Sequence, residues 1–411
     1  MSLEGNVETI FDKAVAEDYG EVIDFANYVF SHAYRPFDFP SLLPKLLKFE
    51  RFMDGAHYLA REAESPGLPR KIKAVVGAYP LEIKLSCGAG ENISLPGCGV
   101  GMVSVHPYSR SKGYMKILMK AAVEEMRRDG AVFSCLGGDR QRYEYFGFTP
   151  AGSTYAFDVK EHNTAHVLGR EWETGLSLEK IGADACARLD QIHAMHEAKG
   201  ARLHRGRDRL FDILSSWRAE TFAVTEGGRF EGYFVYHEKR SSITEIYLND
   251  ISRLPEVLGL FLREMGTWRV KVCVCPHERE KIAILSRLAD EYAQKNAFQF
   301  AVFDHARFAD AFIRFKAGRE KIREGSFVFQ VTDAELGVNS RVRLFAGKDG
   351  VGAEECSPAS GQAPALTMGS VEATRFLSCP AAALSHPAIR ESEFLRDVLP
   401  LPLFLENADE V

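Results

Sequence analysis

The sequence lacks the features that would place the chain in a membrane or in the secretory pathway. No apolar run reaches the roughly 18 residues that cross a bilayer. The N-terminal stretch MSLEGNVETIFDKAVAEDYG is acidic and lacks the basic and apolar regions of a secretory signal. The eight cysteines are scattered, and no C-x-x-C pair occurs. We therefore expect reduced thiols and a cytoplasmic protein.

Two nucleotide-binding fingerprints are also absent. The chain has neither G-x-x-x-x-G-K-S/T nor G-x-G-x-x-G, which argues against a Walker-type NTPase and a dinucleotide-binding domain. An excess of positive charge is missing as well, because 51 Lys and Arg stand against 57 Asp and Glu, for a net charge of −6. We expect no nucleic acid and no membrane as a partner.

A length of 411 residues allows two to four domains with cores of their own. The same order of strand, strand, strand, helix and strand occurs twice, about 140 residues apart. The first copy comprises 57–62, 72–86, 100–105, 111–128 and 131–136, and the second 221–225, 232–237, 242–248, 254–265 and 269–275. We also expect turns at 88–99, helices over 16–34 and 177–218, and a loop at 347–365. The pattern predicts an α+β fold with a structural duplication and a third module.

The segment V103-S-V105-H-P-Y-S-R110-S-K-G113-Y-M115 carries the strongest chemical signal. A strand ends at Val105, and a short basic loop leads into a helix. The N-terminus of a helix presents free N–H groups and a positive dipole end, and Gly113 permits close approach of the ligand. This pattern predicts a site for a diphosphate-bearing cofactor. The residues that we expect to form it are Val103, Ser104, Val105, Arg110, Ser111, Lys112, Gly113, Tyr114, Met115 and Lys116.

These residues resemble the GCN5-related N-acetyltransferase (GNAT) superfamily, whose signature R/Q-x-x-G-x-G/A reads here Arg110-x-x-Gly113-x-Met115, with a larger last residue. The run from Tyr143 to Gly147-Phe148 resembles the family's Y-x-x-x-G-F element. The resemblance implies acetyl-CoA as cosubstrate, no metal, and Tyr143 as the acid that protonates the departing thiolate. It also places Gly138 and Asp139 near the pantetheine arm. Tyr145 is a rival acid at a different offset from the glycine.

Over the whole chain, one active unit, one degenerate unit and a C-terminal module resemble the enhanced intracellular survival (Eis) acetyltransferases. This implies tandem GNAT-like domains at 1–155 and 156–300, a sterol-carrier-protein-like domain at 301–411, and a homo-oligomer, a hexamer in that family. In Eis-like proteins the terminal carboxylate acts as general base, which here would be Val411. The tail departs from the family pattern, so Glu406, Asp409 or a water molecule are alternatives.

The second copy lacks the basic loop. Between its third strand and its helix it reads Asn249-Asp-Ile-Ser-Arg-Leu-Pro255, and Asp250 would repel a diphosphate. We expect this copy to bind no coenzyme A. His193, His196 and His204 lack the spacing of a metal site, so we expect none.

The resulting prediction is an acetyl-CoA-dependent N-acetyltransferase of a primary amine, such as an aminoglycoside-like compound, a polyamine or a peptide lysine. The alternatives are a coenzyme A- or ligand-binding protein without turnover, and a lipid-carrying C-terminal module.

Overall fold

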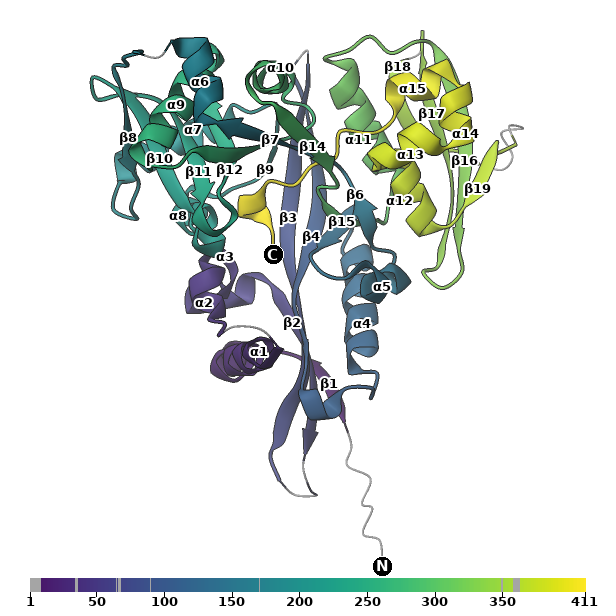
Figure 1. The fold of residues 1–411 in the computed structure, drawn as a ribbon. Coiled ribbons are helices and arrows are strands. Elements are labelled where there is room, and N and C mark those ends of the chain that lie inside the picture. The colour runs from purple at the N-terminus through teal and green to yellow at the C-terminus, as the bar shows by residue number, and fades with distance from the viewer. Residues whose placement is uncertain are drawn as a thin grey trace, which may run out of the picture.

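The structure is a computed structural model that describes residues 9–33, 36–63, 65, 68–88, 90–169, 171–348, 350–357 and 363–411. Two large mixed sheets and a smaller third sheet organise the chain (Figure 1). The predicted α+β fold class is confirmed. No helix in the described ranges is long and apolar enough to cross a membrane.

The first sheet has the order β1-β2-β3-β4-β5-β15-β6, with β9 added along β3. All its neighbours are antiparallel except β4 and β5. Its strands are β1 (Ile10–Lys13), β2 (Ala56–Ala63), β3 (Arg70–Gly88), β4 (Glu91–Val105), β5 (Phe133–Leu136), β6 (Thr149–Ala151), β9 (Ala201–Leu203) and β15 (Phe298–Val302).

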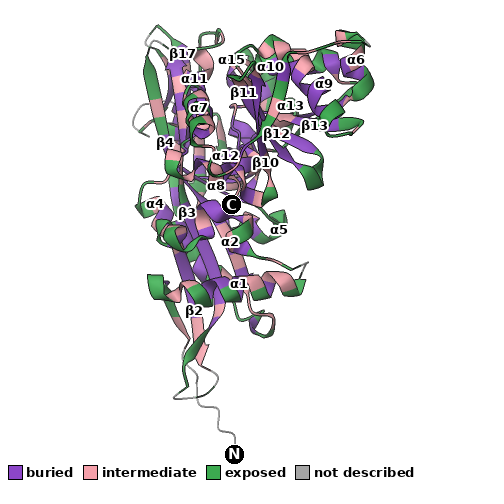
Figure 2. Cartoon of the chain, turned by 90° about the vertical axis from the view of Figure 1, so that its left-hand side faces the viewer, coloured by how far each residue is buried: buried purple, intermediate pink, exposed green. Residues whose placement is uncertain are grey.

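Helices cover both faces of this sheet. The apolar residues of α4 (Tyr114–Arg128) pack on one face, against side chains such as Val76 and Val100. On the other face lie α1 (Tyr19–Ala33), α2 (Phe39–Leu42) and α3 (Pro44–Leu47), against Val75 and Tyr79. The alternation of these neighbouring residues follows the two-residue period of a strand. Figure 2 shows the buried residues running along the long strands toward the C-terminus.

A bulge interrupts β4 where the sheet begins to open. Val75 pairs with Ser104 and Gly77 with Gly101, so Met102 and Val103 together face one residue of β3. Met102 has a φ of 55°, in the left-handed region. The parallel pairing of β4 with β5 ends at Val100, opposite Leu136. Beyond that point, no strand formed by the described residues lies beside the edge of β4 that faces β5.

The second sheet repeats this plan with the order β14-β7-β13-β12-β11-β10-β8. Its parallel pair is β12–β13, with α9 (Leu254–Glu264) packed on the apolar face. The strands are β7 (Thr154–Lys160), β8 (Leu176–Lys180), β10 (Glu220–Glu226), β11 (Arg229–His237), β12 (Ser242–Leu248), β13 (Arg269–Val274) and β14 (Glu291–Lys295).

The two copies exchange strands. β15 follows the second copy in sequence yet lies in the first sheet, between β5 and β6. β7 directly follows β6 and lies in the second sheet, between β13 and β14. The boundaries predicted at 155 and 300 therefore fall inside β7 and β15. Hydrogen bonds of each sheet tie the two copies together.

The third part of the chain forms the sheet β18-β17-β16-β19 and a set of helices. A final segment, Leu399–Val411, which we call the tail, runs back from this part and ends beside β3 and β4 (Figure 1). The sterol-carrier-like nature of the third part remains a prediction. The elements are α11 (His305–Ala317), β16 (Gly325–Asp333), β17 (Val338–Gly347), β18 (Gly350–Glu355), β19 (Leu366–Met368), α12 (Ser370–Ser378), α13 (Pro380–Ser385), α14 (Pro387–Glu391) and α15 (Glu393–Val398).

Three local predictions are wrong. The Gly- and Pro-containing run at 91–99 is not a turn but the first half of β4, because pairing with β3 holds it extended. The segment 177–218 is not all helical: β8 and β9 flank α7 (Cys186–Glu197), and α8 (Leu210–Leu214) follows. The expected loop at 347–365 contains β18, with part of the loop outside the described residues. In each case sheet pairing decides the conformation over local propensity.

Candidate active site

A cavity of about 690 Å³ opens where β4 leaves β5. Nine of the ten residues expected to form the cofactor site in this segment line it, from Val103 on β4 to Lys116 on α4. Its cationic side chains are Arg110, Lys116 and Arg142, and no carboxylate is among its lining residues. Arg110 has no ion-pair partner among the described residues. This charge distribution fits a ligand that carries several phosphate oxygens.

The loop before α4 has the geometry of an anion site. Gly113 is the N-cap of α4, with a φ of 80°, and Ser111 has a φ of 68°. The first turn of α4 contains no acidic residue. The free N–H groups of this turn and the positive end of the helix dipole therefore act together with Arg110. A side chain at Gly113 would meet open space but would be strained by the positive φ.

Lys112 is the one predicted loop residue that does not line the cavity. Its ammonium group makes an ion pair with Glu62 on β2, with Nζ–Oε distances of 2.8 and 2.9 Å. The same carboxylate accepts a hydrogen bond from the hydroxyl group of Tyr114 at 2.9 Å. Lys112 thus fixes the loop against β2 and contributes charge only from outside the cavity.

Gly138 and Asp139 follow β5 and also lie outside the lining residues. Asp139 is exposed and lies 3.7 Å from Arg142. Gly138 has a φ of 136°, and a Cβ atom built on it would come within 2.6 Å of the Tyr143 ring. Glycine at 138 therefore allows the ring of Tyr143 to lie directly beside the C-terminal end of β5.

The two candidate acids differ in environment. Tyr143 is the last residue of the short helix α5 (Arg140–Tyr143) and is only 4% exposed. It lies in the core beside the end of β5 and is not among the lining residues. Tyr145 is half exposed and does line the cavity, with Lys116 Nζ 4.3 Å from its ring centroid. The structure thus places Tyr145 with the cationic groups and Tyr143 near the point where β4 and β5 separate.

Sequence reasoning missed one wall of this cavity. Val29, Phe30 and Ala33, on the last turns of α1, face the basic loop. Arg142 was missed as well, because it is one of several basic residues around a short helix. Only the strand–loop–helix part carries a recognisable motif, whereas α1 contributes apolar side chains that look like ordinary core residues in the sequence.

The chain terminus lies on β4, on the face opposite α4. A Cβ atom built on Gly101 would lie 3.5 Å from the terminal carboxyl carbon of Val411, and one on Gly99 would lie 2.8 Å from Val411 Cγ1. Lys45 Nζ, on α3, donates to the carbonyl oxygens of Ala408 and Glu410 at 2.5 and 2.7 Å. Burial lowers the pKa of Lys45 to about 8. The terminal carboxylate is therefore held within a residue or two of the bulge.

A second cavity, of about 460 Å³, reaches Val411 from the side of the second copy. Its carboxylates are Glu82, Asp208, Asp409 and the chain terminus. Of its cationic side chains, Arg209 is paired with Asp54 and Lys45 holds the tail. Tyr79, on β3, also lines this cavity, and its hydroxyl group lies 3.1 Å from His57 Nε2. Three of its carboxylates are paired as well: Glu82 with Lys84, Asp208 with Arg51 and Asp409 with Arg205.

The carboxylates of Glu406 and Asp409, the alternative bases, are both bound by Arg205. Two of the three histidines considered as metal ligands bond to the backbone. His193 and His196 each make a ring N–H···O bond to a backbone carbonyl, of Arg205 and Leu203 respectively. Burial lowers the pKa of His196 far below its ordinary value, which keeps its ring neutral.

In the second copy, the described turn at 249–253 is not an equivalent of the basic loop. The turn between β12 and α9 is short, and Asp250 accepts hydrogen bonds from the backbone N–H and the hydroxyl group of Ser252. A carboxylate thus occupies the position at which the first copy presents free N–H groups.

The comparisons with known proteins agree with this geometry. Residues 11–151 match the acetyltransferase (GNAT) domain family. A GCN5-related N-acetyltransferase from Kribbella flavida superposes with a TM-score of 0.67 at 14% identity, covering all of both chains. A GCN5-related N-acetyltransferase from Anabaena variabilis superposes with a TM-score of 0.63 at 13% identity, covering 98% of this chain and 99% of that one. Eis1 from Mycobacterium abscessus superposes with a TM-score of 0.57 at 15% identity, covering 89% of this chain and 88% of that one. No curated protein matches.

Residues 11–151 therefore form a GNAT acetyltransferase domain. Over 89% of its length the chain shares the fold of Eis1 from Mycobacterium abscessus. The predicted resemblance is confirmed.

Proposed function

We propose that the protein is an acetyl-CoA-dependent N-acetyltransferase that acts on a primary amine. The observation that supports this most directly is the continuity of the cavity with β4. The free edge of Val103–Val105 leads from the bulge into a cavity lined by three cationic side chains and no carboxylate. An extended pantetheine chain can pair with that edge like an added strand. The diphosphate then lies at the N-terminus of α4.

The proposed reaction uses two groups of the protein, one on each side of the bulge: the terminal carboxylate of Val411 and the hydroxyl group of Tyr143. The amine enters through the acidic cavity and gives up a proton to the terminal carboxylate of Val411. Its nitrogen then forms the bond to the acetyl carbonyl carbon, and a backbone N–H at the bulge stabilises the developing oxyanion. As the C–S bond breaks, Tyr143 protonates the leaving thiolate, and the second proton that the nitrogen loses on forming the amide restores the phenol. A phenol with a pKa near 10 is a suitable acid for this step.

The acidic cavity supports a substrate that carries more than one amine. One amine must be neutral to attack, whereas a second ammonium group can approach Glu82 or Asp208, which also make ion pairs with Lys84 and Arg51. Polyamines and aminoglycoside-like compounds have this character, and so does a lysine side chain with basic neighbours. The hexameric assembly implied by the family resemblance remains a prediction.

The test is thiol release from acetyl-CoA in the presence of spermidine, an aminoglycoside and a lysine peptide. We expect turnover with at least one polyamine-type substrate and acetylation of one nitrogen, seen by mass spectrometry. Binding of acetyl-CoA without thiol release for every amine tested would instead support the alternative of a non-catalytic ligand-binding protein.

A further inference from the structure

The last residues of the chain are tied to the second copy by a buried ionic cluster. Arg205, which follows β9, is fully buried and makes a two-point bond with Asp409, at 3.1 Å from Nε and 2.8 Å from Nη2. It makes a second two-point bond with Glu245 on β12, at 2.9 and 2.8 Å. Its Nη2 also lies 3.1 Å from Glu406. One guanidinium group therefore joins the tail to the second sheet.

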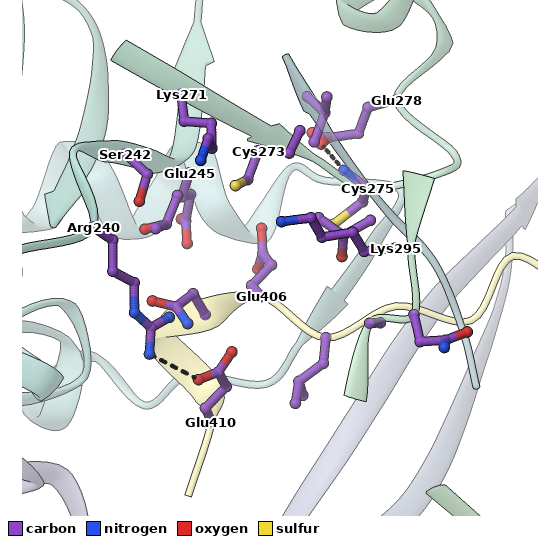
Figure 3. Close-up of a pocket in the computed structure, with 18 of the residues that line it drawn as sticks. Arg240, Ser242, Glu245, Lys271, Cys273, Cys275, Glu278, Lys295, Glu406 and Glu410 are labelled. Carbon is purple, nitrogen blue, oxygen red and sulfur yellow. Dashed lines mark hydrogen bonds and ion pairs between the residues drawn. The ribbon is translucent and has the colours of Figure 1, made fainter. Parts of the chain in front are cut away.

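Three further groups complete the cluster. Lys199 Nζ donates to Glu245 at 3.2 Å and to Glu406 at 2.9 Å. The hydroxyl group of Tyr247 donates to Glu406 at 3.0 Å, and that of Tyr233 donates to Glu245. Figure 3 shows Glu406 and Glu245 approaching one another from the tail and from β12. Every carboxylate in the cluster thus accepts hydrogen bonds from cationic or hydroxyl donors.

The same cluster contains the one group of described residues with the spacing of metal ligands: His196, Glu245 and Glu406, whose ligand atoms lie within 4.8 Å of one another. The two carboxylates are already engaged by Lys199 and Arg205. The positive charges of Lys199 and Arg205 offset most of the negative charge of the three carboxylates in the cluster. Little negative charge is therefore left for a metal ion to compensate. The cluster is thus explained as a structural ionic network without invoking a metal.

The last member of the cluster along the chain, Asp409, comes two residues before the chain terminus. Asp409 is held by Arg205, and Val411 follows against Gly99 and Gly101 of β4. Lys45 of the first domain holds the intervening carbonyl of Glu410. A chain end normally frays unless side chains tie it down. Here the ties come from both copies: Lys45 from the first, and Arg205 from the copy that lacks the diphosphate loop.

We infer that the degenerate second copy positions the terminal carboxylate for the first copy's reaction, and that Arg205 and Asp409 are the positioning pair. The inference rests on the proposed function, in which that carboxylate takes the amine's proton. The bidentate Arg205–Asp409 bond fixes both distance and orientation, which a single-point contact would not do. The second copy thereby has a role in turnover without binding cosubstrate.

The test is Asp409→Asn, which keeps the shape of the side chain, leaves the Arg205–Glu245 bond in place and weakens the tie to the tail. We expect kcat to fall about tenfold, while the Kd for acetyl-CoA stays within twofold. We also expect carboxypeptidase Y to remove Val411 at least fivefold faster than from the wild type. Asp409→Glu, which restores the charge, should recover part of the lost kcat.

Asp212→Asn is the matched control. Asp212 also links the second copy to the first, through an ion pair with Lys48 at 2.6 Å, and among the described residues no hydrogen bond or ion pair joins its carboxylate to the tail. For Asp212→Asn we expect the wild-type kcat and the wild-type rate of Val411 removal by carboxypeptidase Y. If Asp409→Asn retains wild-type kcat, whether or not trimming accelerates, the inference is overturned. If the wild type itself releases no thiol with any amine, the proposed function fails instead, and the two failures are distinguishable.

Discussion

Val411 occupies the space that a side chain on Gly99 would need: a Cβ atom built there would lie 2.8 Å from Val411 Cγ1 and 2.9 Å from Cγ2. Gly99 is extended and sits opposite Tyr79 in the β3–β4 pair. Glycine at this position is therefore explained by the tail that crosses it, and not by backbone conformation. The relationship links the last residue of the chain to the strand on which the proposed chemistry takes place.

Gly99→Ala should displace the terminus while leaving the diphosphate cavity intact. The added methyl group is tolerated by the strand but collides with Val411, so we expect kcat to fall by roughly tenfold with little change in the Kd for acetyl-CoA. Gly20→Ala in α1 is the control, because a Cβ atom there meets nothing within 4 Å. Equal kcat values for Gly99→Ala and the wild type would show that the terminus takes no part in the reaction.

Tyr143→Phe should separate the two candidate acids. Loss of a general acid commonly lowers the rate by a factor of 10² to 10⁴, and we expect a loss of about a hundredfold in kcat at neutral pH. The measurement is steady-state acetyl transfer by Tyr143→Phe and Tyr145→Phe side by side. A large loss in Tyr145→Phe together with an unchanged Tyr143→Phe would identify the exposed tyrosine of the cavity as the acid and refute our assignment.

Arg110→Ala should weaken the binding of acetyl-CoA more than it lowers kcat. The guanidinium group lines the cavity, has no ion-pair partner among the described residues and is exposed, so solvent screens part of its contribution. We expect the Kd for acetyl-CoA, measured by titration calorimetry, to rise roughly fivefold. The increase should be smaller at high salt. Arg128→Ala removes an exposed arginine from the far end of the same helix and serves as the control. An unchanged Kd in Arg110→Ala would argue against a diphosphate at this loop.

The sequence was sufficient to predict the strand–loop–helix around Gly113, because three local signals coincide there: a strand end, a basic turn and a helix start. It also indicated the duplication from the order of elements. It could not show that β15 enters the first sheet or that β7 enters the second, since strand pairing between distant segments leaves no local pattern.

The buried cluster around Arg205 could likewise not be predicted from the sequence. Arg205 and Glu245 are 40 residues apart, and Asp409 lies another 164 residues along the chain. Each looks like an ordinary surface charge in the sequence. Only the fold brings them together, and burial then turns a charged side chain into one that must be paired. The position of Val411 was predicted from a family resemblance and not from its own residue type.

His305 should make the protein less stable as the pH falls. Its ring is 1% exposed, neither ring nitrogen has a hydrogen-bond partner among the described residues, and burial lowers its pKa to about 4. In the unfolded chain its pKa is about 6.5. Between pH 6.5 and pH 4 the unfolded state therefore binds more protons than the folded state. This group's contribution to the free energy of unfolding is complete above pH 6.5 and declines as the pH falls toward 4, by at most about 3 kcal/mol.

His305→Leu removes the titrating ring while keeping an apolar side chain of similar size in the core. We expect its free energy of unfolding, measured by urea denaturation at pH 7.5 and at pH 5, to fall less over this interval than that of the wild type. His57 and His277, whose pKa values burial also lowers to about 4, remain in both proteins and cancel in the comparison. Parallel pH dependence of the two proteins would mean that His305 is protonated or hydrated in the folded state, contrary to its enclosed position.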